Sequence, residues 1–257
     1  MKRNLISTVI ASAMLLSGGA LAQSAPVQKA TTVAKNVVLV HGLYADASSW
    51  SEVIPLLQQA GLHVTAVQNP LTSLADDAAA TRRILALQDG PTVLVAHSYG
   101  GMVISQAGVD RKVSALVYVA ARAPDAGEDY AALAARFPAA PAGAGLIKSA
   151  DGFAQLGEQA FLNDFAGDLD KTRARMLYAV QGQASQSIFT ARTSEAAWRS
   201  KPSYYAVATE DRTINPDFER FMAKRMKAQT IEVQGSHLTL ISHAQEIANL
   251  IEQAAGL

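Results

Sequence analysis

Hydrophobic and polar positions follow two periods that alternate along the chain. Short runs rich in β-branched residues indicate strands, and longer segments with apolar residues every three or four positions indicate helices. The predicted strands are residues 37–40, 63–67, 92–96 and 113–119, separated by predicted helices at 50–60, 73–87 and 101–109. Such alternation implies a parallel sheet with helices on both faces and right-handed crossovers. The predicted fold class is therefore α/β, with a mostly parallel, doubly wound sheet.

The alternation stops between about residues 123 and 201, where Ala, Gly and Pro are dense and no strong β run occurs. We interpret this segment as an inserted helical cap. The core pattern then resumes with a strand at 204–209, a helix at 216–226 and a strand at 230–233. Ser242, with Gln245 three residues later, has the spacing of a capping box and predicts the start of a last helix.

The first 22 residues have the three regions of a secretory signal peptide. Met1-Lys2-Arg3 is a positive stretch, residues 5–16 form an apolar run too short to span a bilayer, and Ala20-Leu21-Ala22 is a small-x-small cleavage site. The alternative, a retained membrane anchor, is disfavoured because small and polar residues interrupt the run at Ser12, Ser17, Gly18 and Gly19. We predict cleavage after Ala22 and a periplasmic or secreted protein without a stable membrane anchor.

Cleavage there leaves 235 residues, which suits one α/β domain of about 200 to 250 residues. Residues 23–35 are polar and without periodicity, and predict a flexible leader before a single domain at 36–257. Without Lys2 and Arg3 the chain carries 20 basic and 22 acidic residues, so nucleic-acid binding is not indicated. The chain has no cysteine, which excludes disulfides and a lipoprotein anchor. No metal or cofactor is expected.

A candidate nucleophile lies directly between a predicted buried strand and a predicted short helix. The sequence Ala96-His97-Ser98-Tyr99-Gly100-Gly101 has the form of a nucleophile elbow, in which a sharp turn projects the serine hydroxyl from the carboxyl edge of the sheet. Ala96 stands where such elbows usually have glycine, and alanine is small enough for the turn. An ordinary turn serine is the alternative, and the flanking strand and helix make it much less favoured.

A serine needs a base within hydrogen-bond reach. In elbows of this kind the acid and the histidine follow the serine in the chain, so only His237 and His243 qualify among five histidines. His237 follows a strand by a short loop, whereas His243 lies at the start of the last helix, and we select His237. The predicted strand 204–209 leads into Glu210 and Asp211. We select Asp211 to orient the imidazole, with Glu210 as a solvated neighbour.

Negative charge develops on the substrate carbonyl oxygen during acyl transfer, and backbone N–H groups are expected to meet it. We predict the N–H groups of Leu43 and Tyr99, the first just beyond the first strand and the second directly after the serine. His41 and His97 flank these loops, and we expect them to make structural hydrogen bonds.

Together these residues resemble the α/β-hydrolase superfamily, and within it the small esterase and hydroxynitrile-lyase-like branch. The resemblance spans residue 37 to about residue 254. It is carried by Val38-Leu39-Val40-His41-Gly42, Ala96-His97-Ser98-Tyr99-Gly100-Gly101, Pro202-Ser203-Tyr204-Tyr205, Thr209-Glu210-Asp211 and Gly235-Ser236-His237. It implies a sheet that lacks some N-terminal strands of the full fold, and a mobile helical cap over the active site.

Two positions separate this chain from the lyases of that branch. The lyases carry threonine where Gly42 stands and lysine where Leu238 follows the histidine. Related dehalogenases and epoxide hydrolases have an elbow aspartate instead of Ser98. The leading interpretation is a serine hydrolase that cleaves a small carboxylic ester through an acyl-enzyme. A cofactor-free perhydrolase or a ligand-sensing protein of low turnover remains open.

The cap contains several large apolar residues, which either line an acyl pocket or form the cap's own core. We favour the second interpretation for these residues: Phe153, Phe161, Phe165, Met176 and Phe189.

Overall fold

A six-stranded sheet forms the centre of the protein, whose computed structural model describes Met1 and residues 33–257. Its strands are β1 (Asn36–Val40), β2 (His63–Val67), β3 (Thr92–His97), β4 (Val113–Val119), β8 (Ser203–Ala208) and β9 (Gln229–Val233). They lie in the order β2-β1-β3-β4-β8-β9, and every neighbouring pair is parallel. All residues of β1 and β3 are buried, as expected for central strands of a sheet covered on both faces.

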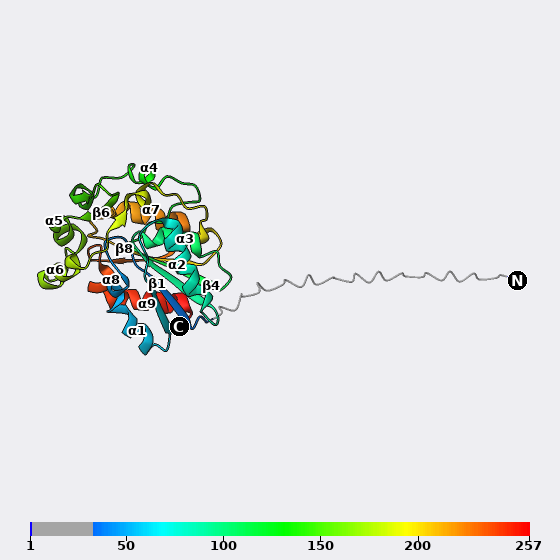
Figure 1. Cartoon of the computed structure of the whole chain (residues 1–257). Helices are drawn as coiled ribbons and strands as arrows, with labels where there is room; N and C mark the ends of the chain where they lie inside the picture. Colours follow the sequence, from blue (N-terminus) through cyan, green and yellow to red (C-terminus); the bar gives the residue numbers. More distant parts are fainter. Residues whose placement is uncertain (2–32) are drawn as a thin grey trace. The chain divides into compact units, whose positions relative to one another are not determined.

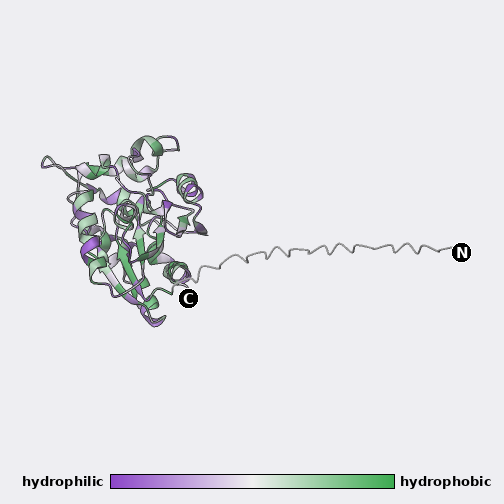
Figure 2. Cartoon of the chain, turned by 90° about the vertical axis from the view of Figure 1, so that its right-hand side faces the viewer, coloured by the Kyte–Doolittle hydropathy of each residue, from purple (hydrophilic) through white to green (hydrophobic). Residues whose placement is uncertain are grey.

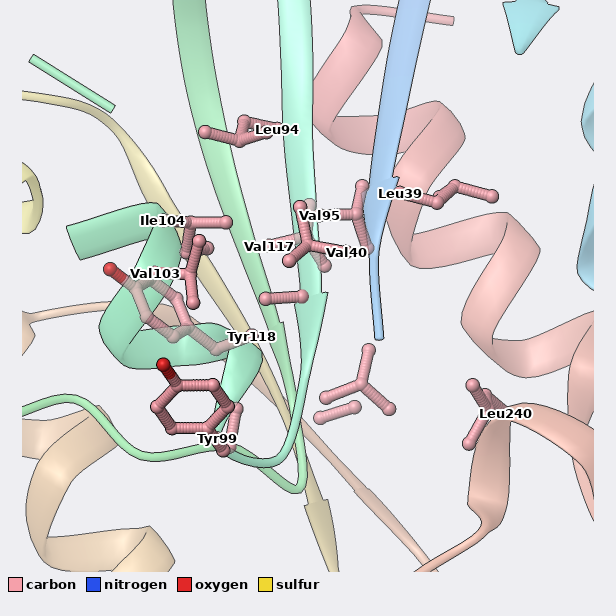
Figure 3. Close-up of a cluster of buried hydrophobic side chains, with 14 of the residues drawn as sticks. Leu39, Val40, Leu94, Val95, Tyr99, Val103, Ile104, Val117, Tyr118 and Leu240 are labelled. Carbon is pink, nitrogen blue, oxygen red and sulfur yellow. The ribbon is translucent and has the colours of Figure 1, made fainter. Parts of the chain in front are cut away.

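Helices cover the sheet in two layers. They are α1 (Val53–Gln59), α2 (Leu74–Ala86), α3 (Gly100–Ala107), α7 (Pro216–Met226), α8 (Thr239–Ser242) and α9 (Ala244–Ala255), with a 3₁₀ turn η1 at Ala47–Trp50. Helix α1 packs against α9, and α2 packs against α3. Figure 3 shows Val103 and Ile104 of α3 on one side of the central strands and Leu240 of α8 on the other. The predicted α/β class with a parallel, doubly wound sheet is confirmed.

The insertion between β4 and β8 is not purely helical, which corrects the sequence interpretation. Its helical pieces are α4 (Tyr130–Ala134), η2 (Pro141–Gly145), α5 (Glu158–Ala160), η3 (Phe161–Phe165), α6 (Lys171–Ala179), η4 (Gln186–Thr190) and η5 (Ala197–Arg199). A second, antiparallel sheet joins β5 (Leu146–Lys148), β6 (Phe153–Leu156) and β7 (Ala184–Ser185). Strands this short carry too few alternating positions to be recognised from sequence. Figure 1 shows α4, α5 and α6 gathered at one end of the central sheet.

The starts of the last helix and of the folded domain also differ from those predicted from the sequence. The last helix begins at Ala244 with no side-chain cap, because Ser242 Oγ instead donates to Asp168 Oδ2 at 2.7 Å. The predicted capping box is therefore wrong. At the other end, Ala34 is already buried and its N–H donates to Ala255 O at 2.9 Å. The fold thus includes the end of the segment predicted as leader, whose remainder, like the predicted signal peptide, lies outside the described residues.

Apolar side chains fill the space between the sheet and its helices, and the strands are the most hydrophobic part of the fold in Figure 2. Among the described residues, no helix is long and apolar enough to cross a bilayer.

Candidate active site

Ser98 lies in a sharp turn at the carboxyl end of β3. Its φ angle is 55°, in the left-handed region that costs a non-glycine residue free energy and is often found at functional sites. Three backbone hydrogen bonds hold the turn: Ser98 N–H donates to Val119 O at 3.2 Å, and Ser98 O accepts from the N–H groups of Gly101 at 3.0 Å and Arg122 at 2.9 Å. The end of β4 therefore clamps the strained residue in place.

Two glycines let other backbone segments approach this turn. A Cβ atom at Gly42 would lie 2.6 Å from Cβ of Ser98, and one at Gly100 would lie 2.8 Å from Val40 O. Real Cβ atoms essentially never come this close to other atoms. The loop after β1 and the start of α3 can pack together only because both positions lack a side chain.

The three residues selected for nucleophile, base and acid meet at this edge of the sheet. His237 Nε2 lies 2.8 Å from Ser98 Oγ, and His237 Nδ1 lies 2.5 Å from Asp211 Oδ2. The side chains of His237 and Asp211 are fully buried, and Ser98 is 5% exposed. With a proton on Nδ1 donated to Asp211, Nε2 is free to accept the serine proton.

Asp211 and Glu210 have different surroundings, as the sequence analysis expects. Asp211 Oδ1 accepts from the N–H groups of Thr213 at 2.6 Å and Ile214 at 2.9 Å, which leaves Oδ2 facing the imidazole. Glu210 is exposed, and its Oε1 accepts from Gln234 Nε2 at 3.1 Å. Only Asp211 contacts His237.

A second carboxyl group, not noticed in the sequence, lies behind Asp211. Glu219 of α7 is fully buried, and its Oε2 accepts from Ala208 N–H at 3.1 Å. Its Oε1 has no hydrogen-bond partner among the described residues. Burial, and next the charge of Asp211, raise the pKa of Glu219 well above its ordinary value. Glu219 is therefore harder to ionise than an ordinary glutamate.

The N–H groups of Leu43 and Tyr99 lie in the two loops that meet at Ser98. Leu43 follows Gly42 in the loop after β1, and Tyr99 precedes the first residue of α3. Within residues 33–257 neither N–H donates to a backbone or side-chain acceptor. Two free donors beside a serine hydroxyl are what an oxyanion site requires.

The Tyr99 side chain points away from this site and is anchored by a buried acid. Its hydroxyl donates to Asp77 Oδ2 at 2.8 Å, and Asp77 Oδ1 accepts from Leu71 N–H at 2.8 Å. Asp77 is fully buried. Burial raises its pKa although both hydrogen bonds lower it. Helix α2 is thereby tied to the residue that follows the candidate nucleophile.

Three other histidines have the surroundings that the sequence predicts for them. His41 Nδ1 lies 2.8 Å from Gly42 O, and its Nε2 accepts from Asn69 N–H at 2.9 Å. His97 Nε2 lies 2.9 Å from His237 O. Burial lowers the pKa of both rings. Their predicted structural hydrogen bonds are confirmed, while His243 lies at the start of α9 and bonds Ser242 Oγ at 2.9 Å.

An aspartate of the cap ties it to the histidine loop. Asp168 accepts hydrogen bonds from Ser236 N–H at 2.9 Å, from Ser236 Oγ and from Ser242 Oγ at 2.7 Å. Burial raises the pKa of Asp168, but these donors outweigh it and leave the pKa below its ordinary value. Ser236 directly precedes His237, so this contact helps to fix the imidazole under the cap.

A narrow, mainly apolar cavity lies between the loop after β1, the cap and the segment that follows His237. It is lined chiefly by Tyr44, Phe161, Phe165, Leu177, Leu238 and Ile241. Phe165 and His237 have ring centroids 5.1 Å apart. Phe161 and Phe165 thus line this cavity and also belong to the hydrophobic core. The two predicted roles, pocket lining and core packing, therefore hold for both residues at once. Met176 is 52% exposed and belongs to neither.

Comparison with known proteins agrees with the fold. Residues 37–250 match the family model described as the alpha/beta hydrolase family. Methylesterase 8 of Arabidopsis thaliana is 25% identical over 84% of this chain and 87% of its own length. Alpha-hydroxynitrile lyase of the same plant is 26% identical over 85% of this chain and 96% of its own. The crystal structure of polyneuridine aldehyde esterase has a TM-score of 0.73 at 21% identity, covering 86% of this chain and 98% of that one. The chain belongs to the alpha/beta hydrolase family.

Proposed function

We propose that this protein is a serine esterase that hydrolyses a small carboxylic ester through an acyl-enzyme, with Ser98 as nucleophile, His237 as base and Asp211 as acid. The observation that carries the proposal is the continuous chain of contacts from Asp211 through His237 to Ser98, at 2.5 and 2.8 Å. A serine becomes nucleophilic when a base held in the correct tautomer can take its proton.

The proposed reaction runs in two halves. Ser98 Oγ attacks the ester carbonyl carbon while its proton passes to His237 Nε2, and the carbonyl oxygen gains negative charge between the N–H groups of Leu43 and Tyr99. The alcohol leaves with the proton from His237, which produces an acyl-Ser98 ester. A water molecule then gives its proton to His237 and attacks this ester, releasing the acid and restoring Ser98.

The surroundings of Gly42 favour ester hydrolysis over cyanohydrin cleavage. The lyases of this branch carry threonine at that position, and a Cβ atom there would lie 2.6 Å from Cβ of Ser98. The backbone arrangement therefore has no room for the lyase residue unless Ser98 moves. Leu238, which directly follows His237, is apolar and buried. The lyases carry lysine at this second position. The methylesterase relative supports the same choice.

The test uses the purified mature protein, short-chain p-nitrophenyl esters and a fluorophosphonate probe. We expect repeated turnover and labelling in the wild type, and loss of nearly all of both in Ser98→Ala with unchanged circular dichroism. His237→Ala is expected to lower kcat by several orders of magnitude, and the matched His243→Ala to change it little. Labelling that persists in Ser98→Ala refutes the nucleophile, and stoichiometric binding without turnover favours a ligand sensor.

The N-terminal segment supports a further part of this proposal, that the enzyme acts in the periplasm or outside the cell. Its supporting feature is the order of a positive stretch, an apolar run and Ala20-Leu21-Ala22. The N-terminal sequence of protein recovered from the periplasm or medium tests it. Maturation at Gln23 is the expected result, and an intact Met1 in the cytoplasm contradicts it.

A further inference from the structure

Arg122 is a partly buried cation at the edge of the candidate active site. It lies three residues beyond Val119, the end of β4, and its backbone N–H donates to Ser98 O at 2.9 Å. Its side-chain carbon Cζ lies 4.8 Å from the ring centroid of Tyr130, a residue of α4 in the cap. The guanidinium group is therefore held between the serine turn and the cap.

The Arg122 charge also acts on two tyrosines in the loops that carry Ser98 and the candidate oxyanion site. Burial raises the pKa of Tyr44 to about 12, and the Arg122 charge opposes that rise. Arg122 acts in the same direction on the Tyr99 hydroxyl, whose pKa burial also raises. Tyr44 follows Leu43, and Tyr99 follows Ser98. Arg122 thus lies next to the turn that carries Ser98 and against α4 of the cap, at the edge of the candidate active site.

Arg122 has no acidic partner within residues 33–257, whereas five other arginines of the cap and its borders have one. The exposed Arg136 and Arg175 of the cap also have none among the described residues. Ion pairs join Arg173 to Glu52, Arg192 to Asp129, Arg199 to Asp125, Arg212 to Asp164 and Arg225 to Glu128. Within residues 33–257 no carboxylate lies within ion-pair distance of Arg122, and its buried Nε makes no hydrogen bond. Residues 2–32 contain no Asp or Glu that could supply a partner side chain.

A partly buried, unpaired guanidinium is costly, because the charge loses water without gaining a partner. Its planar fork of N–H donors matches a carboxylate, with which it forms two parallel charge-assisted hydrogen bonds. We propose that Arg122 binds a free carboxylate on the substrate, so that the preferred substrates are esters carrying a second, unesterified carboxyl group, such as half-esters of dicarboxylic acids. This inference rests on the proposed esterase function and narrows its substrate class.

The kinetic test compares esters that differ only in charge. Monomethyl succinate and monomethyl glutarate place the carboxylate on the acyl side, acetylglycolate places it on the alcohol side, and the corresponding fully methylated diesters are the neutral controls. In Arg122→Gln we expect kcat/KM for at least one charged ester to fall about tenfold or more, mainly through KM, because a hydrogen bond between two charged groups is lost. The matching neutral diester is expected to change less than about twofold.

Two further variants separate recognition from structure. Arg122→Lys keeps the charge without the planar fork, so its loss on charged esters is expected to be smaller than that of Arg122→Gln. Arg136→Gln is the matched control, because Arg136 is exposed and also lies over an aromatic ring, that of Phe221, at 5.6 Å. It is expected to leave the preference for charged over neutral esters unchanged. Equal loss on charged and neutral esters in Arg122→Gln overturns the proposal.

Binding of glutarate, followed by calorimetry, tests the same idea without turnover. We expect glutarate to bind the wild type and Ser98→Ala with similar affinity and Arg122→Gln at least about tenfold more weakly. Equal affinity in all three proteins, or no binding to any, overturns the role of Arg122. If glutarate binding depends on Arg122 but no ester is hydrolysed, the carboxylate-binding role of Arg122 is supported and the esterase proposal fails.

Discussion

Gly42 packs directly against Ser98, so closely that a Cβ atom at position 42 would lie 2.6 Å from Cβ of Ser98. Gly42→Ala must therefore displace the serine or the loop that carries Leu43. A misplacement of about 1 Å in a reacting group costs about 10²-fold in rate, and we expect a loss in kcat of that order. Esterase kinetics measure it. Gly143→Ala is the control, because a Cβ there meets no atom within 4 Å, and activity near wild type in both variants would contradict the prediction.

Asp211 and Glu210 provide a matched pair of neighbouring carboxylates. Asp211→Asn places an amide where Nδ1 must donate, which favours the wrong imidazole tautomer, so kcat is expected to fall by up to about 10⁴-fold. Glu210→Gln removes an exposed charge and is expected to cost less than about tenfold. The measurement is kcat on one ester, with circular dichroism to verify folding. If Glu210→Gln proves the more damaging change, the acid has been assigned to the wrong residue.

Glu219 gives the stability of the protein a pH dependence of predictable sign. Its pKa is raised in the folded state from an ordinary value of 4.5, so above about pH 4.5 the unfolded chain releases a proton that the folded chain retains. The contribution of Glu219 to stability is therefore complete below that pH and is lost as pH rises toward the raised pKa. Glutamine has nearly the same shape as glutamic acid and is neutral at every pH.

We therefore expect Glu219→Gln to become progressively more stable than the wild type as the pH rises above about 4.5, with kcat within about tenfold of the wild-type value. Urea unfolding at several pH values measures the difference in free energy. The exposed Glu210→Gln is the control, with a difference that varies much less over the same range. A pH-independent difference for Glu219→Gln would show that Glu219 is ionised in the folded protein.

Tyr99→Phe tests the anchor between the serine turn and α2. It removes the donor to Asp77 Oδ2 and leaves the fully buried carboxyl with Leu71 N–H as its remaining partner. Losing one partner of a buried polar group costs about 1–3 kcal/mol. We expect thermal unfolding to show that loss, and kcat to change less because the backbone N–H of residue 99 remains. Tyr178 is partly buried, and Tyr178→Phe is the control. Equal stability of the two variants would contradict the anchoring role of Tyr99.

The local pattern of the sequence was enough to predict the central architecture. The sequence predicts the strand Val113–Val119 with both of its ends, and the helix Pro216–Met226 with its first residue and about its last. This is possible because the periods of strands and helices depend on neighbours along the chain. Ser98, Asp211 and His237 each follow a strand of the parallel sheet, namely β3, β8 and β9. This placement also predicted that they would meet, since parallel strands bring their carboxyl ends to one edge.

Contacts between distant segments were decided only by the tertiary structure. Ser242 was predicted to cap α9, but its hydroxyl bonds Asp168, which lies 74 residues away in sequence. The strands of the cap were missed because two to four residues do not establish a period. In the sequence Glu219 looks like an ordinary acid of a helix. Its pKa is raised only because packing buries it near the charge of Asp211. Arg122 likewise differs from the paired arginines only by the absence of an acid near it, a property of three-dimensional packing that no residue pattern encodes.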